Sequence, residues 1–147
     1  HLAASIAVRA ADCAHSVLFT TTIDYITRVK ESWRSNAKET ESDVLRTFVD
    51  YELLILDEVG IQFGTETERL ILFRLLNERY NQIKPTILIS NLPVELTEKE
   101  RREGGKTISD YLGERLYDRL MEGGGQCVAF TWPSYRKQLK ATAGDEK

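Results

Sequence analysis

Leu53-Leu54-Ile55-Leu56-Asp57-Glu58 is a run of four apolar residues that ends in two adjacent carboxylates. A strand covered on both faces has this uninterrupted apolar pattern, because neither face meets water. Two runs of similar composition, Val17–Thr21 and Thr86–Ser90, also lack regular polar–apolar alternation. We therefore predict three buried strands, over residues 17–21, 53–57 and 86–90.

Apolar residues recur at three- to four-residue steps between these runs, which indicates amphipathic helices. We expect helices over 2–13, after Thr22 as N-cap, around 44–48, from about 65 to 80, and along one stripe formed by Ile108, Leu112, Leu116 and Leu120. A last strand is expected at Gln126–Thr131, with a tail helix near Tyr135–Leu139. Alternating strands and helices predict an α/β fold with a mainly parallel sheet.

Length and charge set the domain organisation and the classes of partner. The 147 residues fit one domain, which we place at 1–140 with a frayed tail at 141–147. Twenty Lys and Arg against 23 Asp and Glu give a net charge of −3. No global basic field attracts nucleic acid, so any DNA contact must come from a local surface.

The apolar segments are too short for a membrane, because a bilayer span needs about 20 apolar residues. No signal peptide follows His1. The two cysteines, Cys13 and Cys127, flank no metal-ligand pair and are expected to be buried, as in a reducing compartment. We expect a cytoplasmic protein that does not contact a membrane.

The carboxylates Asp57 and Glu58 follow a predicted buried strand, and ligands of parallel α/β sheets bind at that edge. This pattern is typical of the Walker B motif of P-loop NTPases, in which an aspartate holds Mg²⁺ and a glutamate activates water. Adjacent strand residues point in opposite directions, so the two carboxylates are expected to have different tasks. The alternative is a strand that ends in an acidic turn, completed by Val59-Gly60.

Ser90 and Asn91 end the predicted strand at 86–90, at the same edge of the sheet as the carboxylates. An amide there is suited to hold the attacking water or to contact the γ-phosphate, as the sensor 1 residue does in AAA+ ATPases. The alternative is that Asn91 is a turn residue ahead of Leu92-Pro93, a common use of Asn.

Arg115 and Arg119 are four residues apart and share one helix face, away from the leucine stripe. An arginine presented across a subunit boundary can neutralise charge on a neighbour's γ-phosphate. A solvated face with ion pairs to Glu114 and Asp118 is the alternative.

Gly104-Gly105-Lys106-Thr107 resembles the end of a phosphate-binding loop, but the first glycine position of that motif holds Glu100. The preceding tract, 98–103, is a charged run rather than a strand, and a phosphate loop requires a strand before it. We reject it as a P-loop and expect a flexible, charged loop.

The chain resembles the C-terminal AAA+ domain of DnaC-type helicase loaders, a family close to the IstB-type transposition ATPases. The resemblance covers almost the whole chain and rests on the following segments: His1–Ala4, Leu56–Gln62, Ser90-Asn91, Leu112–Leu120 and Phe130–Arg136. It implies a three-layer P-loop NTPase core. In that family a run like His1–Ala4 follows the Walker A motif, so the first strand and the P-loop are expected to lie outside these 147 residues. The chain alone is therefore expected to be inactive as an ATPase.

The resemblance implies ATP and Mg²⁺ as cofactors and a role for each matching position. Asp57 would hold Mg²⁺, Glu58 would be the catalytic base, and Asn91 would be sensor 1. Arg119 would be the trans-acting arginine finger, with Arg115 as the second choice. Ser90 and Arg136 would contact the nucleotide.

By the same resemblance, single-stranded DNA contacts fall in the helical region after the second strand of the family fold. That region holds Lys30, Trp33 and Arg34 here, an aromatic side chain among cations that suits base stacking and phosphate binding. The alternative for Trp33 is an apolar helix residue that continues the Ile26 and Val29 stripe.

The function implied is ATP-dependent loading of a hexameric replicative helicase onto single-stranded DNA by head-to-tail oligomers. One alternative is an IstB-type transposition helper ATPase that acts on duplex DNA. The other is a non-catalytic, AAA+-shaped module that only binds partners.

Overall fold

The computed structural model describes residues 1–61, 65–130 and 132. The described part contains the following elements in chain order: α1 (Leu2–Asp12), β1 (Val17–Thr21), α2 (Thr22–Ser32), α3 (Glu41–Asp50), β2 (Leu53–Val59), α4 (Glu66–Asn81), β3 (Thr86–Ser90), α5 (Glu98–Arg102), α6 (Ile108–Leu112) and α7 (Glu114–Glu122). Within those residues, no helix has both the length and the apolar composition of a membrane span.

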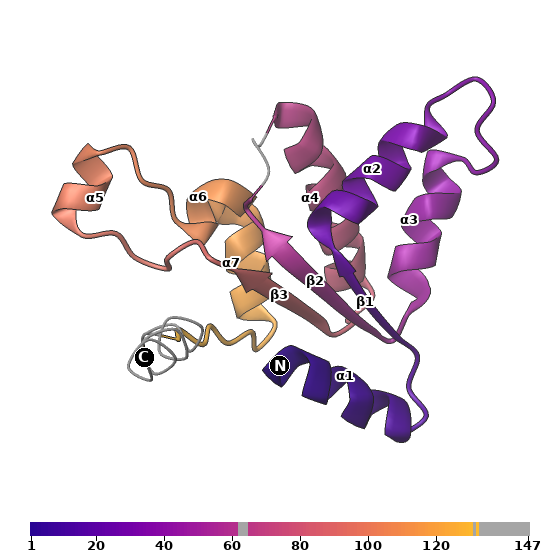
Figure 1. Cartoon of the computed structure of the whole chain (residues 1–147), viewed down its shortest axis with the longest axis horizontal. Coiled ribbons are helices and arrows are strands. Elements are labelled where there is room, and N and C mark those ends of the chain that lie inside the picture. Colours follow the sequence, from indigo (N-terminus) through magenta and orange to yellow (C-terminus); the bar gives the residue numbers. More distant parts are fainter. Residues whose placement is uncertain (62–64, 131, 133–147) are drawn as a thin grey trace, which may run out of the picture.

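The three strands form one parallel sheet in the order β1-β2-β3, so β2 is its centre. Helices α2, α3 and α4 cover one face and α1 lies across the other, which gives three layers (Figure 1). Because the strands are parallel, their carboxyl ends meet at one edge of the sheet. The predicted α/β class with a parallel sheet is confirmed.

The core lies between β2 and the three-helix layer. Leu54 and Leu56 of β2 pack with residues of α2, α3 and α4, including Val29, Phe48 and Leu75. Leu53 and Ile55 are also buried but lie outside this cluster, as expected for alternate residues on the opposite face. Burial on both faces explains the continuous apolar run from which the strand was predicted.

The predicted strands at 17–21 and 86–90 are confirmed, and the central strand continues two residues further than predicted, to Val59. The predicted strand at 126–131 is wrong for residues 126–130, which are not in a strand. Composition alone had suggested it, but a strand requires a hydrogen-bonded neighbour, and β3 pairs only with β2 among the described residues. Residue 131, the predicted tail helix and the tail at 141–147 lie outside the described residues.

Two helix predictions need correction. The N-cap of α2 is Thr21, not Thr22, since the Thr21 hydroxyl accepts a hydrogen bond from the Asp24 backbone N–H at 3.1 Å. The stripe from Ile108 to Leu120 is two helices rather than one, because Gly113, with φ +85°, interrupts the helix. Glycine is the residue that adopts this backbone conformation without a steric cost.

Arg79 of α4 is the most unusual residue of the core, since its charged side chain is 1% exposed. Its guanidinium donates to the Thr86 hydroxyl and to five backbone carbonyls, those of Phe48, Val49, Tyr51, Glu52 and Pro85. Carbonyls at the end of a helix have no partner within that helix, and two of these belong to the last turn of α3. Burial lowers the pKa of Arg79 to about 10, so it stays charged at neutral pH.

We predict that Arg79→Met lowers the free energy of unfolding by about 3 kcal/mol, because it leaves buried carbonyls without donors. Arg74→Met in the same helix is the control. Arg74 is 47% exposed and pairs with Glu41 at the surface, so its loss should cost less than about 1 kcal/mol. Urea unfolding of both variants measures the difference, and equal losses would contradict this role of Arg79.

Glu52 joins the segments that lead into β1 and β2, at the opposite edge of the sheet from the carboxylates of β2. Its carboxylate accepts hydrogen bonds from the Ser16 backbone N–H at 2.8 Å and the Ser16 hydroxyl at 3.1 Å. His15 Nδ1 lies 3.0 Å from the other oxygen. These contacts, the one to His15 foremost, lower the pKa of Glu52 from 4.5 to about 2.

This lowered pKa predicts a pH dependence of stability. The unfolded chain binds the Glu52 proton more tightly than the folded chain, so the contribution of Glu52 is complete above about pH 5 and is lost as the pH falls towards 2. Glu52→Gln should flatten this part of the stability profile, measured by thermal unfolding between these pH values. Glu31→Gln, at an exposed carboxylate of α2, should leave the profile unchanged.

Candidate functional site

Asp57 and Glu58 lie at a register shift in the β2–β3 pairing. Leu56 pairs with Leu88 and Val59 pairs with Ser90, so β2 contains one residue more than β3 over this interval. This is a β-bulge, a feature that redirects side chains near binding sites. Val59 returns to the same core cluster as Leu54 and Leu56, which places both carboxylates within the irregular part of the strand.

The backbone at this bulge is strained and held by hydrogen bonds. Glu58 has φ +60°, a left-handed conformation that costs a residue with a side chain about 1–2 kcal/mol. The Asp57 carboxylate accepts a hydrogen bond from the Glu58 N–H at 2.8 Å, and the Thr22 hydroxyl donates to the Asp57 carbonyl at 3.0 Å. As a result Asp57 is half-buried and Glu58 is exposed. The two carboxylates therefore differ in environment.

Ser90 fixes the turn that follows β3. Its hydroxyl donates to the Val59 carbonyl at 2.6 Å and accepts from the Leu92 N–H at 3.0 Å. These two bonds tie the end of β3 to the bulge of β2, and they place the exposed Asn91 at the same edge of the sheet as Asp57 and Glu58. The predicted contact of Ser90 with nucleotide stays a prediction.

Gly60 allows this close approach of the two strand ends. It has φ +92°, and a Cβ at this position would lie 2.3 Å from Leu92 Cδ1. A side chain at residue 60 would therefore collide with the Leu92 side chain, which would have to shift to make room.

We predict that Gly60→Ala both destabilises the fold and perturbs residues 90–92 through the displaced Leu92 side chain. Gly104→Ala is the matched control, since Gly104 has φ +80° with no atom within 4 Å of the added Cβ. It should cost only the backbone conformation, about 1 kcal/mol. Thermal unfolding combined with amide chemical shifts of residues 90–92 separates the two effects. Equal shifts in both variants would contradict the close packing at Gly60.

Arg119 of α7 is anchored on α4. Its guanidinium donates to the Asn77 side-chain oxygen and lies 5.7 Å from the centre of the Tyr80 ring. Arg115, one turn earlier, is exposed and makes no hydrogen bond or ion pair within the part of the chain that the structure describes. The order of these two residues as arginine finger stays a prediction.

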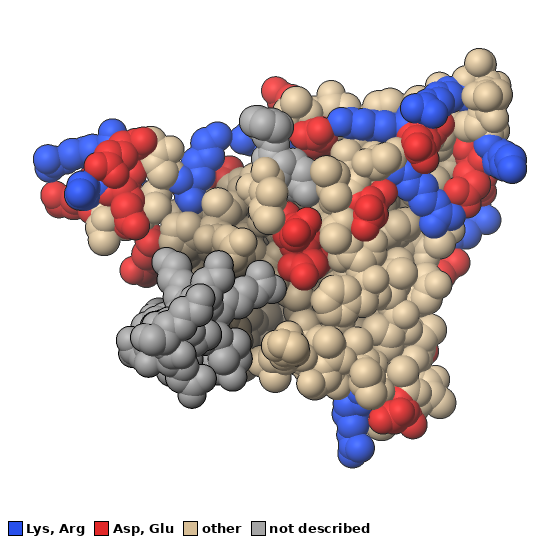
Figure 2. Space-filling model, viewed as in Figure 1, with Lys and Arg blue, Asp and Glu red and all other residues tan. Residues whose placement is uncertain are grey.

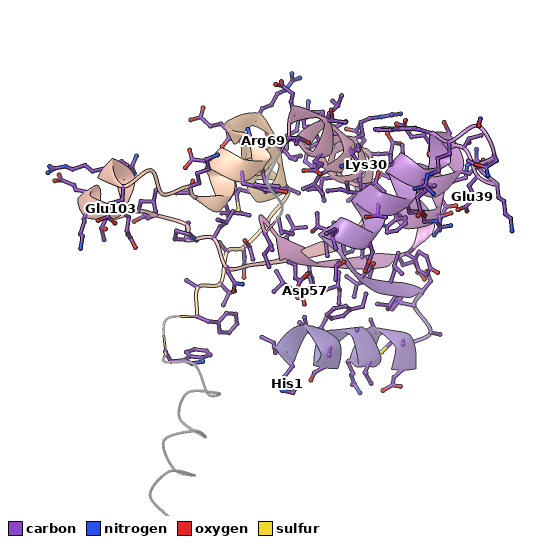
Figure 3. All side chains as sticks on the ribbon, turned by 45° about the horizontal axis from the view of Figure 1, so that its top comes forward. His1, Lys30, Glu39, Asp57, Arg69 and Glu103 are labelled. Atoms are coloured by element: carbon purple, nitrogen blue, oxygen red, sulfur yellow. The ribbon has the colours of Figure 1, made fainter. Side chains whose placement is uncertain are left out.

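The residues predicted to bind single-stranded DNA lie on α2 and just after it, in the helical layer (Figure 3). Lys30 Nζ is 2.7 Å from Glu68 Oε1 of α4, and Trp33 Nε1 donates to Glu41 Oε2 of α3 at 2.7 Å. Arg34 is exposed. Basic and acidic side chains alternate over this surface, whereas acidic atoms lie where β2 ends (Figure 2).

Three further predictions have plain outcomes. Gly104–Thr107 follows the short helix α5 and ends at Thr107, the N-cap of α6, so it has no strand before it and is not a phosphate loop. The preceding charged run 98–103 is mostly helical, and residues 104–107 form a turn and loop, as expected. Cys13 and Cys127 are exposed, not buried as predicted. Arg136 lies outside the described residues.

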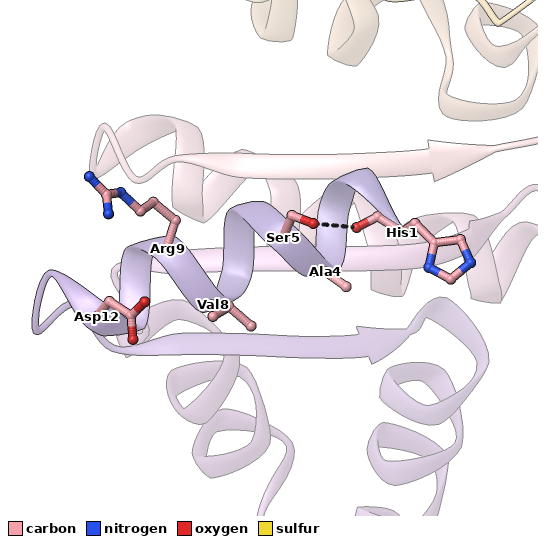
Figure 4. Close-up of a pocket in the computed structure, with 6 residues that line it drawn as sticks. All are labelled: His1, Ala4, Ser5, Val8, Arg9 and Asp12. Carbon is pink, nitrogen blue, oxygen red and sulfur yellow. Dashed lines mark hydrogen bonds between the residues drawn. The ribbon is translucent and has the colours of Figure 1, made fainter.

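A surface hollow runs along α1 and is lined by His1, Ala4, Ser5, Val8, Arg9 and Asp12 (Figure 4). All six belong to α1 or its N-cap, and the carboxylates of β2 are not among them. Among the described residues, no group of three or more His, Cys, Asp or Glu is placed to hold a metal ion. One carboxylate with nucleotide phosphates is, however, a usual way to bind Mg²⁺. Asp57 fits that requirement.

Comparison with known proteins shows which family this chain belongs to. The family model described as "IstB-like ATP binding protein" matches residues 1–143. The chain belongs to this family. The replicative helicase loader DnaC of Escherichia coli K12 is 30% identical over 139 residues, 95% of this chain and 52% of DnaC. The protein YdaV of the same strain is 31% identical over 139 residues, 95% of this chain and 51% of YdaV.

Solved structures agree on the fold. A crystal structure of the DnaC helicase loader has a TM-score of 0.57 and 22% identity, over 76% of this chain and 58% of that one. AMPPCP-bound DnaA from Aquifex aeolicus has a TM-score of 0.53 and 19% identity, over 83% and 41%. The predicted AAA+ core is therefore confirmed as a fold. The chain spans about half the length of the curated relatives it matches.

Sequence reasoning missed the bulge at 57–58 and the contacts of Arg119, Lys30 and Trp33. No residue pattern marks these contacts, because their partners lie 8 to 42 positions away in the chain. The bulge had one available signal. Gly60 directly follows the strand, and an isolated glycine there is typical of a bulge or of close backbone approach.

Proposed function

We propose that residues 1–140 are the ATPase domain of a replicative helicase loader that acts on single-stranded DNA. The observation that carries the proposal is the pair Asp57 and Glu58 on a strained bulge, at the same edge of the sheet as Asn91 in the turn after β3. Strained backbone persists where the surrounding structure holds it, often at functional sites. The match to DnaC over 95% of the chain supports the same function.

Each residue then has a task at the edge of the sheet. Asp57 binds Mg²⁺, and the exposed Glu58 takes a proton from the attacking water. Asn91 orients that water, and Ser90 fixes the turn in which Asn91 lies. Mg²⁺, when bound with ATP, neutralises charge on the phosphates. Arg136 contacts the nucleotide, and Arg119 or Arg115 reaches the γ-phosphate of the neighbouring protomer in a head-to-tail oligomer.

The proposed partners are a hexameric replicative helicase and single-stranded DNA, the latter bound by Lys30, Trp33 and Arg34. The indole of Trp33 is 50% exposed, which leaves ring surface for base stacking. An IstB-type transposition helper that acts on duplex DNA is the second candidate, and the family model that matches residues 1–143 favours it.

The test uses a protein in which this chain follows a Walker A segment. We predict that Glu58→Gln lowers the rate of ATP hydrolysis by about 10²–10⁴-fold, because the general base is lost, while ATP binding remains. Glu95→Gln, at an exposed carboxylate after β3, is the control and should hydrolyse ATP normally. Undiminished hydrolysis by Glu58→Gln would contradict the catalytic assignment of Glu58, whereas no hydrolysis by the unsubstituted protein would favour the partner-binding module.

The DNA preference separates the two ATPase candidates. A helicase loader should bind single-stranded DNA more tightly than duplex DNA of the same length, and its hydrolysis rate should respond to the single strand. The reverse preference would support the transposition helper instead.

A further inference from the structure

Two of the three residues proposed to bind DNA already contact acidic side chains from other helices. Lys30 pairs with Glu68 in the first turn of α4, and the Trp33 indole N–H pairs with Glu41 in the first turn of α3. Both contacts measure 2.7 Å, and they join residues 38 positions apart for Lys30–Glu68 and 8 positions apart for Trp33–Glu41. The donors that a DNA strand would meet on α2 are therefore engaged within the chain.

The Lys30–Glu68 pair has an asymmetric environment. The side chain of Lys30 is 43% exposed, whereas that of Glu68 is 15% exposed. Glu68 is also the third residue of α4, where its backbone N–H donates to the Thr65 hydroxyl and its carboxylate accepts from the Thr65 N–H. The carboxylate is therefore held in place by the helix N-terminus, and Lys30 is the more exposed partner.

Lysine binds phosphate as a point charge, so its ammonium group can release a carboxylate and bind a phosphate in its place. Because the Lys30 ammonium group is in contact with water, we expect this ion pair to change an equilibrium constant by about fivefold, which is weak enough for DNA to displace it. We propose that Glu68 competes with DNA phosphate for Lys30 and thereby lowers the affinity of this surface for single-stranded DNA. The inference rests on the proposed DNA-binding function.

Glu68 offers a cleaner test than Glu41. Glu41 contacts both Trp33 and Arg74, so its removal disturbs two partner side chains at once. Glu68→Gln retains the cap, because glutamine serves the same position of a capping box, and removes only the charge that holds Lys30. Glu66→Gln, two residues earlier on the same helix turn, removes the same charge from an exposed position.

The experiment measures binding of a fluorescent oligothymidylate to the full chain by anisotropy, with thermal unfolding as a check on each variant. Glu68→Gln should bind about two- to fivefold more tightly than Glu66→Gln. Lys30→Gln should bind more weakly than the wild type, and its salt dependence should fall by about one counterion. The double variant Lys30→Gln/Glu68→Gln should match Lys30→Gln alone.

The outcomes separate the inference from the function on which it rests. If Lys30→Gln weakens binding but Glu68→Gln equals Glu66→Gln, the competition is wrong and the DNA surface stands. If Glu68→Gln still strengthens binding in the Lys30→Gln background, the stronger binding results from the change in net charge rather than from release of Lys30. The proposed competition is then also wrong. If Lys30→Gln binds like the wild type, or no variant binds at about 100 µM protein, the DNA-binding proposal itself fails.

Discussion

The buried guanidinium of Arg79 connects the segments whose relative positions determine how the sheet forms. It lies on α4, yet its donors reach the end of α3, the segment before β2 and the segment before β3. A planar group with five N–H donors can satisfy several carbonyls at once, which lysine cannot do. One side chain thereby ties together the segments that lead into both strands, and the candidate site lies at the opposite ends of these strands.

The site itself is shaped by the backbone more than by contacts of its side chains. The extra residue in β2, the left-handed Glu58 and the glycine at position 60 together bring two carboxylates and Asn91 to one edge. The Ser90 hydroxyl closes this arrangement by bonding across the two strands. The strain is local, while the buried strand and helices beneath it supply the stability that maintains it.

The sequence predicted what depends on short-range pattern. The continuous apolar runs located β1 and β3 to the residue, and Thr65 with the acidic first turn located the start of α4. It failed where the outcome depends on a distant partner. Residues 126–130 remain outside the sheet although their composition suits a strand, and a local feature, the backbone conformation of Gly113, was overlooked in an apparently continuous stripe. The contacts of Lys30, Trp33 and Arg119 likewise depend on tertiary packing.

Because of the bulge, the geometry of the site depends on the number of residues in this part of β2. Regular alternation would place residue 58 on the core face, but the extra residue gives that position to Val59 and leaves Glu58 to solvent. Deleting either residue between Leu56 and Val59 would restore regular pairing and would remove one of the two carboxylates from this edge. The number of residues in this part of β2 therefore matters for the site as much as the identity of the two acidic residues.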